Sequence, residues 1–291
     1  MKFFYVFNYD RYKDDFVLTK KEIFINKLHK LFFGYSKMIE PSNIKDSSFK
    51  LIAKSLFVNN DEIIRGRNLE RINKEIEEDD IKYLCLENDV DRKIFEDVGL
   101  SILDGRELRF KTLFEKVKKI IESPDKTQIG LMIDGKSNYE YIKMICEYFP
   151  LVIFFVNNPY LGDNISGNIL KDIGSSIYVS KDINSSKSCE LIFDLSRETF
   201  SDKINIIKTD NYISLYKKKE IVEARRKINN IKVRCPNINI ERSNVKNLEL
   251  SFLEALMYED KVVKSKNDII NVDLDKYLYD KCFKLIFFNE E

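Results

Sequence analysis

The sequence has few of the residues on which phosphate-binding loops and hydrolytic active sites depend. Its 291 residues include only 9 glycines and one histidine. Glycine lets the main chain come close to a phosphate, so its scarcity weighs against a glycine-rich nucleotide loop. The single histidine, His29, weighs against a serine or cysteine triad and against a histidine-based metal centre. We interpret His29 as a solvated or packed side chain of a helix.

The chain also lacks an excess of charge and a long apolar run. Its formal net charge is +1, so no global field favours nucleic acid or an anionic membrane. The longest apolar run, residues 151–156, is far shorter than the ~20 residues that span a bilayer. Residues 3–7 are too short for the apolar region of a signal peptide. We therefore expect a cytoplasmic protein without a membrane partner.

The cysteines are odd in number and contain no C-x-x-C pair. This pattern favours buried free thiols in a reducing cytoplasm over disulfides or zinc ligands, and no metal site is predicted. The five are Cys85, Cys146, Cys189, Cys235 and Cys282.

The order of expected elements indicates an α/β fold with two domains. A strand over 81–86, a helix over 89–98 and a strand over 101–103 form a βαβ unit, so the two strands are expected to be parallel. The predicted organisation is an N-terminal α/β domain (1–105), a linking helix (106–124), a Rossmann-like α/β domain (125–216) and a C-terminal helical segment (217–291) that folds back on the interface, with helices over 220–228, 248–258 and 273–287.

From residue 129 the pattern alternates between strand and helix, as in one half of a Rossmann domain, with amphipathic helices expected over 138–148 and 164–173. The run 151–156 is continuously apolar, which is typical of a central parallel strand. Over roughly 90 residues this order resembles the cofactor domains of two-domain dehydrogenases such as the shikimate dehydrogenase and glutamyl-tRNA reductase families. The resemblance is one of pattern, and it implies a Rossmann-like fold with a mostly parallel sheet and NAD(P) as the cofactor.

The turn after the first strand of this domain departs from the dinucleotide fingerprint G-x-G-x-x-G. Residues 134–139 read Asp-Gly-Lys-Ser-Asn-Tyr, with one glycine of three. Asp134 puts a negative charge near the pyrophosphate, and Tyr139 stands where a small residue lets the helix pack closely. We therefore predict a degenerate nucleotide loop and no cofactor. If NADP is nevertheless bound, the residues expected to hold it are Asp134, Gly135, Lys136, Ser137 and Asn157, the last in place of a ribose-binding acid.

Residues 130–137 also satisfy the P-loop expression G-x-x-x-x-G-K-[ST], and residues 191–194 resemble a Walker B strand. The four positions that should form the phosphate nest are Leu, Met, Ile and Asp. Three bulky apolar side chains favour a strand, and the carboxylate would repel the phosphates. The segment is therefore predicted to be a buried strand followed by a turn.

Three acids, Asp104, Asp134 and Asp194, directly follow or end expected strands, where α/β sheets place ligand-binding residues. Aspartate is also ordinary turn and helix-cap chemistry, so both interpretations stay open, and no catalytic residue is predicted. A basic segment over 217–234 is interpreted as a solvated face, with nucleic-acid binding as the less favoured alternative.

The leading functional hypothesis is a non-catalytic protein-binding or regulatory protein built on a degenerate dehydrogenase-like scaffold. It rests on a sheet pattern that is intact while the glycine, acid and histidine chemistry is missing. The alternative is an NAD(P)-dependent oxidoreductase with an atypical cofactor loop over 134–139. The expected partner is another protein or a second copy of the chain.

Overall fold

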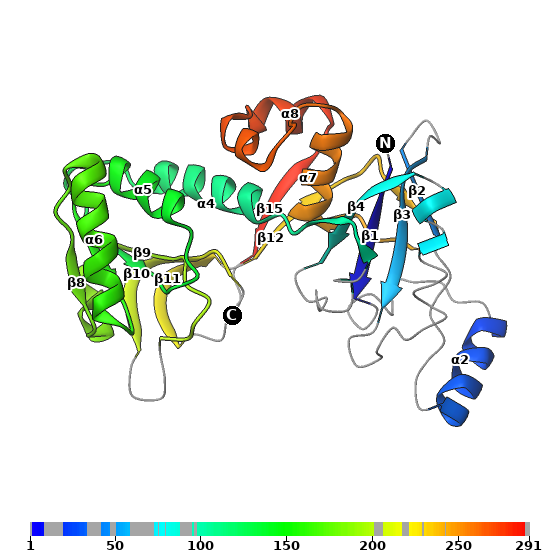
Figure 1. Ribbon diagram of the computed structural model, residues 1–291, viewed down its shortest axis with the longest axis horizontal. Coiled ribbons are helices and arrows are strands. Elements are labelled where there is room, and N and C mark those ends of the chain that lie inside the picture. The colour runs from blue at the N-terminus through cyan, green and yellow to red at the C-terminus, as the bar shows by residue number, and fades with distance from the viewer. Residues whose placement is uncertain are drawn as a thin grey trace. The chain divides into compact units, whose positions relative to one another are not determined.

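The computed structural model divides into two compact units (Figure 1). Unit 1 comprises Met1–Leu108 and Lys232–Ile286, and unit 2 comprises Arg109–Ile231 and Phe287–Glu291. The predicted domain limits, and the placement of the C-terminal segment on an interface, stay predictions. Most of the helix expected over 89–98 lies outside the described residues. The structure describes residues 2–8, 20–33, 42–46, 51–58, 73–74, 76–78, 80–87, 95, 98–200, 206–216, 221–228, 230–241 and 243–288.

Unit 1 is built on a six-stranded sheet, sheet A. Its strand β1 is rich in aromatic residues and is buried from Phe3 to Phe7, because parallel strands β3 and β4 flank it. The predicted parallel pairing of β4 with β5 is confirmed. In spatial order the strands are β13 (Asn239–Ile240), β2 (Ser42–Lys45), β3 (Leu51–Val58), β1 (Lys2–Asn8), β4 (Ile81–Leu86) and β5 (Ser101–Leu103).

Helix α7 (Leu250–Glu259) packs on sheet A against β1, β4 and β5. All residues from 250 to 257 are buried, and the Phe252 ring lies 5.4 Å from the rings of both Phe3 and Tyr5. A helix buried on every side is expected to be apolar throughout, so Glu254 stands out. Further described elements outside sheets A and B are α2 (Lys20–Phe33), η3 (Lys266–Asn271), α8 (Leu274–Asp280) and sheet C, in the order β14 (Asn247–Glu249), β12 (Asn230–Arg234), β15 (Lys284–Phe288).

Unit 2 contains a second six-stranded sheet, sheet B, in which each neighbouring pair of strands is parallel. The chain runs outward from β6 through β7 to β8, and then returns to the other side of β6 for β9, β10 and β11. This is the strand order of the doubly wound Rossmann sheet. The strands are β11 (Val222–Ile228), β10 (Ile207–Ser214), β9 (Leu191–Asp194), β6 (Ile129–Met132), β7 (Val152–Phe155) and β8 (Tyr178–Ser180).

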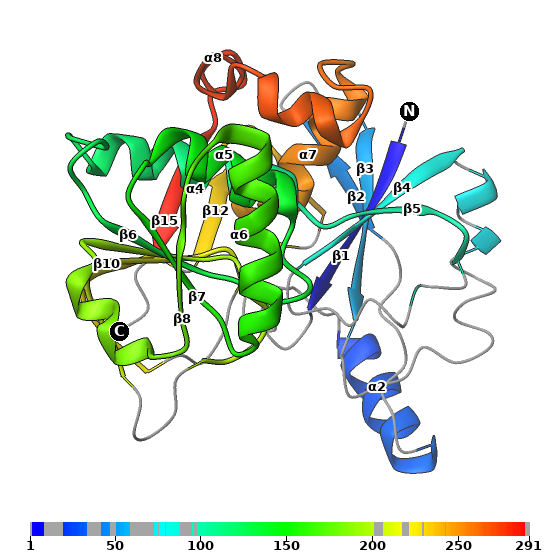
Figure 2. The same ribbon diagram turned by 60° about the vertical axis from the view of Figure 1, so that its left-hand side comes forward.

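The helices of unit 2 are placed by apolar faces that the sequence predicts. Helix α4 (Arg106–Ile120) begins in unit 1, and within unit 2 its Phe110 ring stacks on Tyr141 of α5 (Tyr139–Tyr148) at 3.9 Å. Helix α6 (Pro159–Ile173) crosses a face of sheet B (Figure 2), and η2 (Ile183–Ser188) precedes β9. The predicted fold class, two α/β parts of which the second is Rossmann-like with a mostly parallel sheet, is confirmed by the strand order and pairing.

Two predicted elements are wrong, and the start of a third is misplaced. The helix expected over 220–228 is strand β11, because apolar Val222 and Ala224 alternate with charged residues and pack against the core. The helix expected over 273–287 ends at Asp280 and is followed by β15, since Cys282 has a left-handed φ of 57°. Helix α6, expected from residue 164, begins at Pro159, a residue favoured in a first helical turn.

Candidate functional site

The candidate site of unit 2 lies at the carboxyl ends of β6 and β9, where the strand order reverses. The chain leaves β6 through Asp134, whose side chain is buried. Its Oδ2 accepts hydrogen bonds from the main-chain N–H groups of Arg197 (2.6 Å) and Glu198 (3.0 Å). Its Oδ1 accepts from the N–H of Lys136 (2.9 Å) and the hydroxyl of Ser137 (3.1 Å). The carboxylate therefore ties the β6–α5 turn to the loop after β9.

These hydrogen bonds decide the ionisation of the carboxylate. Burial by itself would raise the pKa of Asp134, but the N–H groups of Arg197, Lys136 and Glu198 and the Ser137 hydroxyl outweigh it, and the pKa is lowered. A negative charge is thus already held by the main-chain donors that could have held a phosphate.

The first turns of both crossover helices are capped by the protein's own acceptors. At α5, the N–H of Ser137 donates to the Asp134 carbonyl (3.1 Å), and the N–H of Glu140 donates to the Asn138 side chain (3.0 Å). At α6, the Asn158 side chain accepts in the same way, and a proline without an N–H follows it. A helix N-terminus binds anions through such N–H groups, so these caps compete with a ligand phosphate.

The residues predicted to hold NADP gather around the same turn. Gly135 and Lys136 are exposed, and Asn157 donates from Nδ2 to the Glu198 carboxylate (3.3 Å). Tyr139 donates from its hydroxyl to Asp172 on α6 (2.9 Å), and burial together with this bond raises the pKa of Tyr139 to about 12. The structure thus places the predicted residues around one turn, and their role in binding NADP stays a prediction.

The two glycines of the P-loop expression do not form a phosphate nest. Gly130 lies inside β6, paired on both sides, and a Cβ there would overlap the Ile192 and Phe155 side chains. A Cβ on Gly135 would meet nothing closer than Leu161 at 4.0 Å, so no close approach requires that glycine. The prediction of a buried strand followed by a turn is confirmed.

Asp194, the second acid at the switch point, is also used within the protein. It is fully buried, and its carboxylate accepts from the Tyr212 hydroxyl (2.6 Å) and from the N–H and hydroxyl of Ser196 (3.0 and 2.8 Å). For Asp134 and Asp194, the turn-and-cap interpretation is therefore the one that the geometry supports.

The third strand-end acid, Asp104, belongs to a different kind of arrangement. In unit 1 it follows β5, and one oxygen of Asp104, one of Glu107 and one of Glu254 all lie within 4.8 Å of one another. The N–H of Gly105 donates a hydrogen bond to Glu254 Oε2 at 2.7 Å. The Arg106 guanidinium forms an ion pair with Asp104 at 2.9 Å. Sequence reasoning missed Glu254; its one signal was an acid within an otherwise apolar helix.

The pKa of Glu254 is raised to about 8. Burial is the largest cause, and the charges of Glu107 and Asp104 add to it, while Lys266 and the Gly105 N–H act in the opposite direction. Burial raises the pKa of the Cys85 thiol, and the negative charge of Glu254 raises it further.

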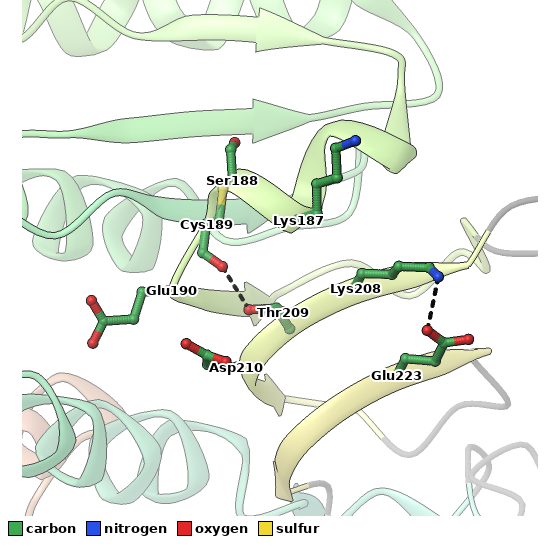
Figure 3. Close-up of a pocket in the computed structure, with 8 residues that line it drawn as sticks. All are labelled: Lys187, Ser188, Cys189, Glu190, Lys208, Thr209, Asp210 and Glu223. Atoms are coloured by element: carbon green, nitrogen blue, oxygen red, sulfur yellow. Dashed lines mark hydrogen bonds and ion pairs between the residues drawn. The ribbon is translucent and has the colours of Figure 1, made fainter.

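A cavity of about 450 Å³ lies at the other edge of sheet B (Figure 3). It is lined by residues just before β9 and in the first halves of β10 and β11. Within it Thr209 donates to the Cys189 carbonyl (2.9 Å), and Lys208 pairs with Glu223 (2.9 Å). The cavity is thus distant from the carboxyl edge, at which α/β sheets bind ligands.

Among known proteins, the chain is similar to solved structures alone. No protein-family model matches the chain, and no curated protein matches it in sequence. Among solved structures, a shikimate dehydrogenase in complex with NADP⁺ is similar at 8% identity over 94% of both chains, with a TM-score of 0.34. Ornithine carbamoyltransferase from Pyrococcus furiosus is similar at 9% identity over 76% of this chain and 74% of its own, with a TM-score of 0.35.

None of the helices among the described residues has the length and apolarity needed to cross a bilayer. Of the five cysteines, Cys85, Cys146, Cys189 and Cys235 are buried and free, as predicted. Cys282 is free but exposed, contrary to the prediction, because it lies in the turn after α8.

Proposed function

We propose that this chain is a non-catalytic protein-binding or regulatory protein built on a dehydrogenase-like scaffold. The observation that carries the proposal is the Asp134 carboxylate, which occupies the N–H groups of Arg197, Glu198 and Lys136 at the switch point of sheet B. A dinucleotide would have to bring its diphosphate beside this charge and replace those bonds. Like charges held close together repel strongly in a partly buried site.

A protein partner or a second copy is the proposed ligand of unit 2. Its solvent-exposed large apolar side chains include Tyr160 on α6 (86%), Leu170 on α6 (53%) and Tyr178 on β8 (67%). Strand β8 ends sheet B, and the unpaired groups of an edge strand are a template for another chain. We propose no nucleic-acid partner, because the described part of the basic segment includes β11, which also carries the acidic Glu223, paired with Lys208 of β10.

We propose a reducing cytoplasm as the compartment, because the buried thiols are unpaired and burial raises their pKa; that of Cys146 reaches about 12. Thiols of this kind persist where disulfides do not form.

A thermal-shift titration tests the absence of a cofactor. NADP⁺, NADPH, NAD⁺, NADH and ATP are added to the full chain at millimolar concentration. A ligand at 100 times its dissociation constant stabilises the native state by about 2.7 kcal/mol, and we expect no such shift. If NADPH raises the melting temperature and Gly135→Leu abolishes the effect, the proposal is wrong and the alternative, an NAD(P)-dependent oxidoreductase, is favoured.

Sedimentation over a range of concentrations tests self-association through the edge strand. We expect a concentration-dependent dimer that Tyr178→Ser weakens. Tyr279→Ser, which removes a tyrosine of similar exposure (84%) from unit 1, is the matched control. A monomer at every concentration would exclude a second copy as the partner.

A further inference from the structure

Unit 1 holds a cluster of acidic oxygens that the proposed function does not use. Asp104 and Glu107 come from the turn after β5 and the start of α4, and Glu254 comes from the buried helix α7. One oxygen from each lies within 4.8 Å of the other two. Ca²⁺ holds oxygen ligands at about 2.3–2.6 Å, so two ligands on opposite sides of one ion are about 5 Å apart. The three oxygens are therefore close enough to share a single ion.

A second observation is that buried polar atoms at this place have no protein partner. Glu254 is completely buried. Neither its Oε1 nor the Oε2 of Glu107 has a hydrogen-bond partner among the described residues. Ser251, one helical turn before Glu254 and 1% exposed, has an unpartnered hydroxyl oxygen. Nearly all buried polar atoms in native proteins have a hydrogen-bond partner, so exceptions gathered at one place point to a bound ion or water.

The turn that carries the cluster is fitted closely to α7. Gly105 has a left-handed φ of 69°, and a Cβ on it would lie 2.5 Å from the Ser251 nitrogen. Its N–H donates to Glu254 Oε2 at 2.7 Å, which holds the carboxylate against residues 104–107. The acidic oxygens are thus positioned by main-chain packing, as a binding site requires.

The neighbouring protein cations do not complete the cluster. The Arg106 guanidinium bonds Asp104 Oδ2 at 2.9 Å, and the exposed Lys266 acts on Glu254 only through its charge. With both present, Glu107 Oε2 and Glu254 Oε1 still lack a donor in the described part of the chain. A bound cation would coordinate both of these oxygens and offset the negative charge of the three carboxylates.

We propose that Asp104, Glu107 and Glu254 bind one hard divalent cation of the Ca²⁺, Mg²⁺ and Mn²⁺ class. Carboxylate oxygens are the ligands that these ions prefer, and the Ser251 hydroxyl lies on the same face of α7 for a further contact or for a coordinated water.

Calorimetric titration of the EDTA-treated full chain with CaCl₂, MgCl₂ and MnCl₂ tests the proposal, with thermal unfolding recorded on the same samples. We expect one equivalent of at least one cation to bind and to raise the melting temperature in a saturable way. Glu254→Gln and Glu107→Gln should each weaken binding by at least about tenfold. Glu115→Gln makes the same chemical change in a surface pair with Lys118 and should leave binding unchanged.

Two results would overturn the proposal. One is no heat and no thermal shift with any of the three cations at millimolar concentration. The other is equal binding by the wild type, Glu254→Gln and Glu107→Gln, which would place the ion elsewhere. Far-UV circular dichroism without cation shows whether each variant is folded. If Glu254→Gln does not fold, the test depends on Glu107→Gln, because the side chain of Glu107 is only half-buried.

Discussion

Asp134 of unit 2 and Glu254 of unit 1 are both buried carboxyl groups, yet their surroundings provide different numbers of hydrogen-bond donors. Four donors converge on Asp134, three of them main-chain N–H groups, and its pKa is lowered. Glu254 has one N–H, from Gly105, and two acidic neighbours, and its pKa is raised to about 8. Burial alone therefore does not predict the charge of an acid; the local count of donors and charges does.

Removing the satisfied acid should have the largest effect. Asp134→Ala leaves the N–H groups of Arg197, Glu198 and Lys136 without their acceptor, and we expect the free energy of unfolding to fall by roughly 3–5 kcal/mol. Urea unfolding measures this. Asp172→Asn, a change in a more exposed acid that accepts from Tyr139, is the control. A loss for Asp134→Ala no larger than that of the control would contradict the role of Asp134 as the tie between two loops.

The pH dependence of stability should differ in sign between the two acids. The folded pKa of Glu254, about 8, lies above its ordinary value of 4.5, so the folded state binds the extra proton between these limits. In EDTA, the free energy of unfolding should fall by roughly 2–4 kcal/mol as the pH rises from 5 to 8, and Glu254→Gln should flatten the curve. The lowered pKa of Asp134 instead removes stability as the pH falls below about 4. A wild-type curve that is flat from pH 5 to 8 would argue against the cluster geometry.

A glycine pair isolates the packing that holds Glu254. Gly105 and Gly99 have almost the same φ, 69° and 70°, but a Cβ on Gly105 would lie 2.5 Å from the Ser251 nitrogen, whereas one on Gly99 would meet nothing within 4 Å. Gly105→Ala should therefore cost about 1–3 kcal/mol more than Gly99→Ala, which carries the backbone strain alone. Chemical denaturation of both variants gives the difference, and equal losses would show that the turn is not packed on α7.

The smallest effect is expected where a buried acid keeps most of its donors. Tyr212→Phe removes one hydrogen bond to Asp194 and leaves the two from Ser196, so we expect a loss of about 1–1.5 kcal/mol. The midpoint of urea unfolding measures it. A loss as large as that of Asp134→Ala would show that the two switch-point acids are equally dependent on single donors.

Much of unit 2 could be predicted from local sequence signals. The continuous apolar run at 151–156 is the buried strand β7, and the charge at Asp134 is where the fingerprint departs from a dinucleotide loop. The edge strand β11 was mistaken for a helix because its charges obscured a period of two. The start of α6 was missed, although Asn158 and Pro159 are a cap and a first helical residue.

The partners of the two acids could not be predicted in this way. Asp134 meets N–H groups 63 and 64 positions along the chain, and Glu254 meets one that is 149 positions away. Local patterns report the period of apolar residues, and they carry no record of which loops the sheet order brings together.

The amino-acid sequence by itself determined the alternation of strands and helices, the parallel sheet of unit 2 and the acid in its nucleotide turn, because these depend on the periodicity and chemistry of neighbouring residues. Only the tertiary structure decided that both carboxylate oxygens of Asp134 accept hydrogen bonds, while Glu254 Oε1 has no partner among the described residues. That difference arises because main-chain donors and acidic side chains from distant segments reach the two groups only after the sheets have formed.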